Sequence, residues 1–204
     1  RTIVMLAVVA LVVLAGVLVA NLLNHRSRQI AVSPPTPVEI DTAAAAERLA
    51  AAIRLKTISS ATEPDANAAA FAALHAHIAA SYPAFHAVAT REIVGNYSLL
   101  YTWRGSDLDA APIAWLAHQD VVPIAPGTEP DWQAAPFDGV VRDGYIWGRG
   151  SWDDKGNLFA MLEAVEHFAK AGIRPRREGL CDAVAESHGD AGAFVAAAAP
   201  HRDR

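Results

Sequence analysis

The sequence predicts an α/β fold preceded by one transmembrane helix, and three observations carry this prediction. An unbroken apolar run opens the chain, from Ile3 to Ala20. Two short segments in the middle of the chain are rich in residues that favour β-strands. Segments on both sides of them place apolar residues three and four positions apart, which is typical of helices that bury one face. The body of the chain should therefore combine a sheet with packed helices.

The apolar run has the length of a membrane-spanning helix. With the leucines that extend it past Asn21, about 21 residues at ~1.5 Å each span roughly 31 Å, close to the ~30 Å hydrocarbon core of a bilayer. A cleaved signal peptide is the alternative, but its apolar region is usually shorter, and residues 18–20 make a poor cleavage site. We therefore interpret residues 1–24 as a transmembrane signal anchor, with residues 3–23 in the membrane.

The flanking charges leave the orientation of this anchor open. Arg26 and Arg28 follow the run, while Arg1 precedes it, so the rule that positive charge stays in the cytoplasm does not decide the case. Residues 25–39 are polar and then rich in proline, which is typical of an extended spacer.

Composition narrows the remaining possibilities. The 204 residues include one cysteine, Cys181, so an internal disulfide is excluded. The formal net charge of −5 is too mild to indicate a nucleic-acid partner. Hydrophobic residues make up 52% of the chain, which is enough for a core. After the N-terminal segment, roughly 165 residues remain, which suits one ordinary domain or part of a larger one.

Three helices are expected in the body. Asp41 or Thr42 can cap the first one, which has apolar residues along one side. The second should occupy residues 65–81 and the third residues 157–171, with Gly172 placed to end the latter.

Histidines His75, His77 and His86 lack metal-ligand spacing, and we interpret them as surface or interface residues rather than as ligands.

The expected strands lie between these helices. Residues 92–103 and 112–117 are separated by a short polar turn, which predicts an antiparallel pair. Residues 140–147 predict a hairpin that turns at Asp143-Gly144. The long loop at residues 121–138 contains Trp132 and Phe137, and a loop of this length is usually functional. These two rings could be simple hydrophobic cover or one wall of a substrate cleft, and the sequence leaves both open.

Two short signatures contain the candidate metal-binding and catalytic residues. The first is His118-Gln119-Asp120, directly after the apolar run 112–117. Because residues two apart on a strand point the same way, His118 and Asp120 can face one site. A metal-bound imidazole usually donates its other N–H to a carboxylate, which is the arrangement that this pair would allow. The pair is nevertheless short enough to arise by chance.

The second signature is GRGSWDDKG at residues 148–156. Asp153 and Asp154 stand between two glycines and the apolar stripe of the helix that follows. One of them could simply cap that helix. Alternatively, one carboxylate could join His118 in binding zinc, since carboxylate oxygen and imidazole nitrogen are both zinc ligands. A carboxylate that bridges two metals would create the close pair used in two-metal hydrolysis.

These signatures together resemble the M20 zinc metallopeptidases, within them the Gly-Xaa carboxypeptidases and N-acyl-amino-acid hydrolases. The matching stretches are SLLYTWRG, LAHQDVVPIAPGTEPDW and PFDGVVRDGYIWGRGSWDDKG, and the resemblance runs from about Ala43 to Arg177. It implies an incomplete three-layer α/β/α zinc-peptidase-like catalytic domain. By position, it implies His118 as the ligand of one metal, Asp153 as the ligand bridging two Zn²⁺ ions, and Asp120 as the catalytic carboxylate behind His118.

The resemblance also implies a function and partners. The substrates would be small peptides or N-acyl amino acids, the full-length proteins would form homodimers, and the body would lie outside the cytoplasm on a single-pass anchor. Residues 40–177 would form the N-terminal part of the catalytic domain. The alternatives are a non-catalytic anchored fragment that binds a metal or a partner, and a chain that does not fold.

Residues 178–204 depart from the family pattern. The family continues with a strand that ends in a Glu-Glu pair, which supplies a general base and a metal ligand, and neither is recognisable after Arg177. Glu186, His188 and Asp190 have suitable side chains but no matching context. We interpret this segment as a divergent, irregular tail produced by a change of reading frame or of gene model near Arg177. The chain is therefore expected to be a weak or inactive hydrolase.

Overall fold

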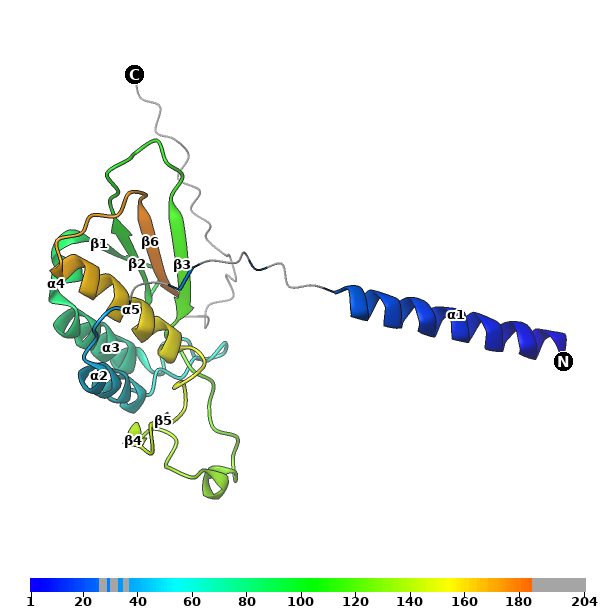
Figure 1. The fold of residues 1–204 in the computed structure, drawn as a ribbon. Helices are drawn as coiled ribbons and strands as arrows, with labels where there is room; N and C mark the ends of the chain where they lie inside the picture. Colours follow the sequence, from blue (N-terminus) through cyan, green and yellow to red (C-terminus); the bar gives the residue numbers. More distant parts are fainter. Residues whose placement is uncertain (26–28, 30–32, 35–36, 185–204) are drawn as a thin grey trace. The chain divides into compact units, whose positions relative to one another are not determined.

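The computed structural model describes residues 1–25, 29, 33–34 and 37–184, with side chains described up to residue 179. The chain divides into two compact units, Arg1–Glu39 and Ile40–Arg204. We describe each unit by itself (Figure 1).

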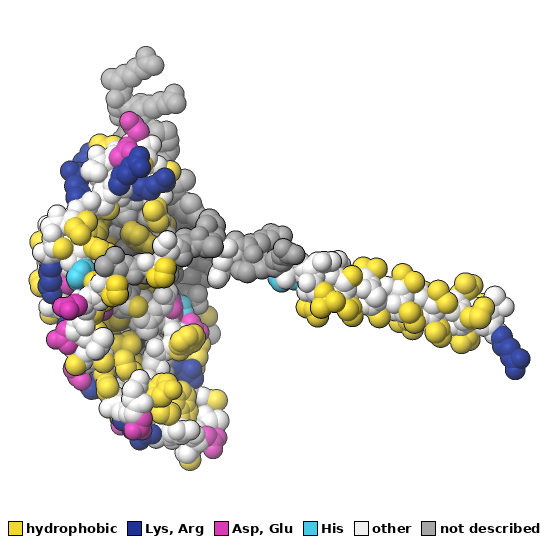
Figure 2. All heavy atoms as spheres, in the orientation of Figure 1, with side chains coloured by type: hydrophobic (Ala, Val, Ile, Leu, Met, Phe, Trp, Pro, Cys, Tyr) yellow, Lys and Arg dark blue, Asp and Glu magenta, His cyan; other side chains and the backbone are white. Residues whose placement is uncertain are grey.

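In its described residues, the first unit contains one helix, α1 (Thr2–Asn24), whose side chains are all exposed. Hydrophobic side chains follow one another along its visible face (Figure 2). An 18-residue window of this helix has a mean hydropathy of 3.2, and its length and composition would let it cross a membrane or act as a signal sequence.

The second unit combines helices with two sheets. Its elements are α2 (Thr42–Arg54), α3 (Ala68–Ser81), α4 (Pro83–Val88), β1 (Thr90–Val94), β2 (Ser98–Trp103), β3 (Ile113–His118), η1 (Glu129–Asp131), β4 (Val140–Arg142), β5 (Tyr145–Trp147), α5 (Lys155–Lys170) and β6 (Gly179–Val184). The α/β prediction is confirmed. Asp41 caps α2 by accepting the Ala44 N–H at 3.0 Å. Gly172 follows α5 with a positive φ of 68°, as expected of the residue after a helix end.

The larger sheet shows that the predicted antiparallel pairing of its first strands with β3 was wrong. Its strand order is β1-β2-β6-β3, so β2 and β3 do not form the expected antiparallel pair. Instead, β6 lies between them, antiparallel to β2 and parallel to β3. The chain leaves β3, passes through α5 and returns to the same sheet, and such a crossover produces parallel neighbours.

The strand β6 also contradicts the prediction of an irregular tail for residues 179–184. Its short sequence, GLCDAV, mixes small, polar and apolar residues and shows little alternation. Hydrogen bonding to a strand on each side stabilises it in the sheet, and this pairing cannot be recognised from six residues alone. The remaining tail expectations, including those for Glu186, His188 and Asp190, fall outside the described residues.

The hydrophobic core lies between the larger sheet and its helices (Figure 1). Leu99, Tyr101 and Trp103 alternate along β2 and point into it. Helix α5 contributes Leu158, Phe159, Leu162 and Val165 to the same cluster. On β3, Leu116 remains 56% exposed. Within the described part of the chain, helices therefore cover one face of this sheet, which corresponds to two of the three expected layers.

The smaller sheet is the hairpin β4–β5, which confirms the prediction for residues 140–147. It turns at Asp143 and Gly144, whose φ angles are 55° and 78°. Two residues with positive φ between paired strands are typical of the turn that matches strand twist, and Asp-Gly suits it.

Candidate functional site

The two sequence signatures meet where β3 ends and α5 begins. His118 is the last residue of β3, and Asp153 lies two residues before the first turn of α5. The Nε2 atom of His118 lies 3.1 Å from Oδ1 of Asp153. The His118 side chain is 25% exposed and that of Asp153 is 81% exposed. The pair therefore lies at the surface of this unit, where an ion or a substrate can reach it.

Asp120 lies behind the imidazole. Its Oδ1 is 3.3 Å from His118 Nδ1, and its backbone carbonyl oxygen is 3.0 Å from the same nitrogen. Asp120 is buried, with 4% of its surface exposed. A proton on Nδ1 would be donated to Asp120, which leaves the Nε2 lone pair directed toward Asp153. This is the tautomer that a metal ligand requires.

Asp154 joins the two signatures in a way that the sequence did not reveal. It occupies the N-cap position of α5, yet its side chain makes no capping hydrogen bond. Its Oδ2 atom instead accepts the backbone N–H of His118 at 3.0 Å. This bond fixes the end of β3 against the start of α5, and so holds His118 beside Asp153.

Gln119 anchors the strand end from the opposite side. Its side chain is fully buried; its Oε1 lies 3.0 Å from His75 Nε2, and its amide donates to the carbonyl of Tyr97. The Thr57 hydroxyl donates to the Gln119 carbonyl at 2.7 Å. His75 is therefore buried and structural, with 8% exposed, and the expectation that it lies on the surface was wrong. Burial lowers the pKa of His75.

Lys155, in the second signature, is buried and structural. It is completely buried, and its Nζ donates to the carbonyls of Ala52 and Leu55 at 2.8 and 2.7 Å. These carbonyls end α2, so the lysine ties that helix to the site. Burial lowers the pKa of Lys155 to about 7. Only its place in the motif could have indicated this role.

The charges around His118 favour its protonated form in the absence of a metal. Partial burial alone would lower the pKa of His118, but the hydrogen bond to Asp153 and the charges of Asp120 and Asp154 outweigh it, so the pKa is raised. The same concentration of negative charge would stabilise a bound cation.

The donor atoms suit a zinc ion. Zinc binds imidazole nitrogen at ~2.0–2.1 Å and carboxylate oxygen at ~2.0–2.2 Å, and tetrahedral angles then place the two atoms about 3.3 Å apart. The 3.1 Å between His118 Nε2 and Asp153 Oδ1 is close to this value. Among the residues that the structure describes, no group of three or more His, Cys, Asp or Glu side chains is placed so that it could hold a metal ion.

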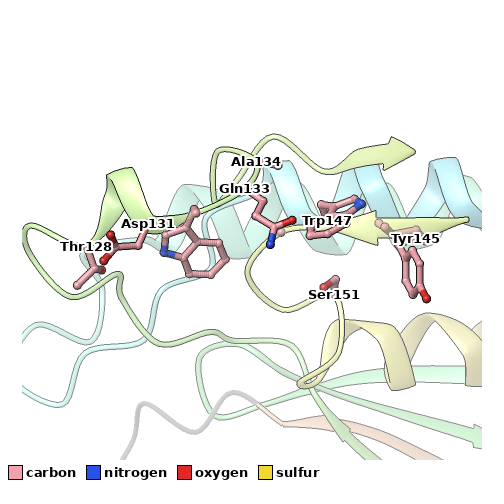
Figure 3. Close-up of a pocket in the computed structure, with 10 residues that line it drawn as sticks. Thr128, Asp131, Gln133, Ala134, Tyr145, Trp147 and Ser151 are labelled. Atoms are coloured by element: carbon pink, nitrogen blue, oxygen red, sulfur yellow. The ribbon is translucent and has the colours of Figure 1, made fainter. Parts of the chain in front are cut away.

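A pocket lies between η1 and the hairpin β4–β5 (Figure 3), and its lining includes Ser151, two residues before Asp153. We call it the aromatic pocket; it has a volume of about 420 Å³, and Trp132, Tyr145, Trp147 and Ser151 contribute to its lining. Of the two rings that the sequence left open, Trp132 forms part of this wall. Phe137 lies elsewhere, beneath the Lys56 ammonium at 5.4 Å.

The sequence and the fold are both similar to those of known proteins. Residues 114–201 match the family described as Peptidase family M20/M25/M40. The match continues past Arg177, where the sequence alone suggested that the resemblance ends.

Curated relatives and solved structures give the same answer. The chain is 38% identical to "Probable carboxypeptidase S-like 2" of Dictyostelium discoideum over 168 residues, covering 78% of this chain and 32% of the relative. It is 42% identical to "N-fatty-acyl-amino acid synthase/hydrolase PM20D1" of Bos taurus over 133 residues, covering 64% of this chain and 26% of that one. The crystal structure of human carnosine dipeptidase 1 superposes with a TM-score of 0.54 at 18% identity, over 74% of this chain and 33% of that one.

The chain thus spans about a third, or less, of the length of these relatives. The structural likeness shows the α/β fold. By sequence, the chain is similar to members of peptidase family M20/M25/M40, and the family match covers residues 114–201.

Proposed function

We propose that this chain forms part of a zinc-dependent hydrolase that cleaves the amide bond of small peptides or N-acyl amino acids. The observation that carries the proposal is the 3.1 Å approach of His118 Nε2 to Asp153 Oδ1. The names of the relatives, a carboxypeptidase and an N-acyl-amino acid hydrolase, support the same reaction class.

Each residue of the pair would have a defined role. His118 and Asp153 would be zinc ligands, and Asp153 would bridge to a second zinc in a complete site. Asp120 would hold the imidazole in the ligand tautomer through Nδ1. Zinc, when bound, supplies Lewis-acid polarisation of an amide carbonyl and makes a water molecule more acidic. Asp154 would keep the two ligands together through its bond to the His118 N–H.

The proposal extends to the membrane. Helix α1 would be an uncleaved anchor, and the body would lie outside the cytoplasm. Its apolar length supports an anchor. A protease-protection assay on membrane vesicles would locate the body: cleavage by external protease only after the vesicles open would place it on the enclosed side.

Zinc binding tests the proposed site directly. Loss of one ligand should weaken zinc binding by more than about 100-fold, because even residues that only orient ligands contribute ~10–100-fold. The measurement is isothermal titration of zinc into the full chain and into His118→Ala, with His167→Ala on α5 as the matched control. Equal affinity in both variants would reject His118 as a ligand.

One observation favours a second function, that of a membrane-anchored protein that binds metal without catalysis. His118 and Asp153 would be two ligands, whereas zinc usually takes four, and the described residues contain no group of three or more His, Cys, Asp or Glu side chains placed to hold one ion. The sequence after Arg177 also contains no Glu-Glu pair that would supply a general base. General-base catalysis typically contributes ~10²–10⁴-fold, so we expect weak or undetectable cleavage of a Gly-Xaa dipeptide by the 204-residue chain. Efficient zinc-dependent cleavage would exclude the second function.

A further inference from the structure

The aromatic pocket has the size and the lining of a small-molecule site. Its volume of about 420 Å³ lies within the ~300–1,000 Å³ that is usual for such sites. Two tryptophans, Trp132 and Trp147, and Tyr145 supply large apolar surfaces. In Figure 3, Thr128 and Asp131 lie toward one end, and Tyr145 lies toward the other. An elongated apolar ligand could lie along these rings.

Two arginines contact the tryptophan rings that line this pocket. The Arg149 guanidinium lies 5.2 Å from the Trp132 ring, and that of Arg142 lies 5.0 Å from the Trp147 ring. Arg142 also donates to the carbonyl of Gln133 at 3.0 Å, which ties the hairpin to the opposite wall. Cation–π contacts restrain both rings, and the hydrogen bond joins the two walls. Restraint of the walls would lower the ordering cost of binding.

The pocket is adjacent to the candidate zinc ligands. Ser151 is part of its lining and precedes Asp153 by two residues. Two residues span at most about 7 Å of backbone, so the lining reaches the immediate neighbourhood of Asp153. A molecule whose amide bond lies at Asp153 could place one end in the pocket.

The polarity of the lining indicates which end that is. Trp132, Trp147, Tyr145, Ile146 and Ala134 make most of it aromatic or aliphatic. The free carboxylate of an N-acyl amino acid would lose hydration against these side chains. An uncharged aliphatic chain avoids this penalty. Its transfer from water to these rings is favourable in proportion to the apolar area buried.

We propose that the aromatic pocket binds the aliphatic acyl group of an N-acyl amino acid, on the carbonyl side of the scissile amide, with the carboxylate outside. This assignment rests on the proposed function, since it places the amide at His118 and Asp153. It identifies Trp132 and Trp147 as the residues that select for acyl chain length.

Binding of a homologous series tests the assignment. The full chain in lipid nanodiscs is titrated with N-acetyl-, N-butanoyl-, N-hexanoyl- and N-octanoylglycine, with empty nanodiscs subtracted for partition into lipid. Each buried methylene should tighten binding by about fourfold until the pocket is filled. Leucylglycine, which carries an ammonium on its first residue, should bind more weakly than N-hexanoylglycine.

Substitutions in and beside the aromatic pocket test whether the dependence of affinity on chain length arises there. Trp147→Ala should lower the affinity for N-octanoylglycine by at least tenfold and flatten the length series, because it removes one wall. Val141→Ala on the neighbouring strand is the control, since Val141 is 49% exposed and does not line the pocket. Circular dichroism of both variants checks that the fold is kept. Equal loss in the two variants would overturn the assignment.

Zinc titration of the same samples separates this inference from the proposed function. A flat length series in a chain that binds zinc through His118 overturns the acyl pocket alone. A steep series that Trp147→Ala abolishes supports the pocket, even where His118→Ala leaves zinc affinity unchanged and the proposed metal site fails. Tighter binding of leucylglycine than of N-hexanoylglycine also overturns it, because the pocket would then select a charged amine.

Discussion

At the scale of single residues, the site depends on side chains that never face a substrate. Gln119 and Asp154 hold the end of β3 from two sides, one through His75 and the other through the His118 N–H. The sequence indicated His118 and Asp153 by a simple rule, that a strand end and a helix start can converge. It could not indicate these supports, because no comparable rule predicts that Gln119 bonds to His75 or that Asp154 bonds to the His118 backbone.

His75 gives this support a pH dependence. Burial lowers its pKa in the folded chain, so the unfolded chain, with a pKa near ~6.5, binds more protons between the two values. The contribution of His75 to stability should therefore rise as pH increases through this window, and protonation below it should destabilise the fold. Urea unfolding from pH 4.5 to 7.5 of the wild type and His75→Gln provides the comparison.

The difference between the two proteins removes contributions from other groups, His118 among them. The free energy of unfolding of the wild type should increase relative to that of His75→Gln as pH rises. This difference should stop growing near pH 7. A constant difference at every pH would show that His75 titrates alike in both states.

At the scale of elements, helix periodicity and the hairpin were readable from the sequence. Asp41, Gly172 and the Asp143-Gly144 turn lie where local chemistry places them. The strand β6 was not readable, because its place between β2 and β3 comes from pairing with strands more than 60 residues away. The predicted antiparallel pairing of β2 with β3 was wrong for the same reason, because β6 lies between them.

Contact between α2 and the hairpin provides an element-scale prediction. Gly139 and Gly144 both have positive φ, at 57° and 78°, but a Cβ on Gly139 would overlap the Ala50 carbonyl, whereas one on Gly144 meets open space. Gly144→Ala should lose about 1–2 kcal/mol from backbone strain alone. Gly139→Ala should lose a further ~1–3 kcal/mol from overpacking against helix backbone. Thermal unfolding measures both, and equal losses would argue against the close approach.

At the scale of the whole molecule, the described sheet ends at β3. This strand is the last in the order β1-β2-β6-β3, and its Leu116 is 56% exposed. Unpaired strand edges promote association between chains. The fold class was predictable because it needs only the number and type of elements, whereas the strand order depends on long-range pairing.

Self-association should follow from this edge. Residues 40–204 should form oligomers that Leu116→Lys reduces, because a lysine on an edge strand opposes pairing. Leu108→Lys is the matched control, since Leu108 is 63% exposed in a loop. Light scattering after size exclusion compares the three proteins. A similar reduction by both lysines would point to general hydrophobic association instead of the strand edge.

The central claim, that an imidazole and a carboxylate from the two signatures share one zinc ion, is tested most directly by X-ray absorption of the zinc-loaded chain. We expect nitrogen or oxygen neighbours at ~2.0–2.2 Å, together with the outer-shell scattering of an imidazole. His118→Ala should abolish the imidazole contribution, and Asp153→Ala should lower the number of oxygen neighbours. Spectra unchanged by both substitutions would contradict the claim.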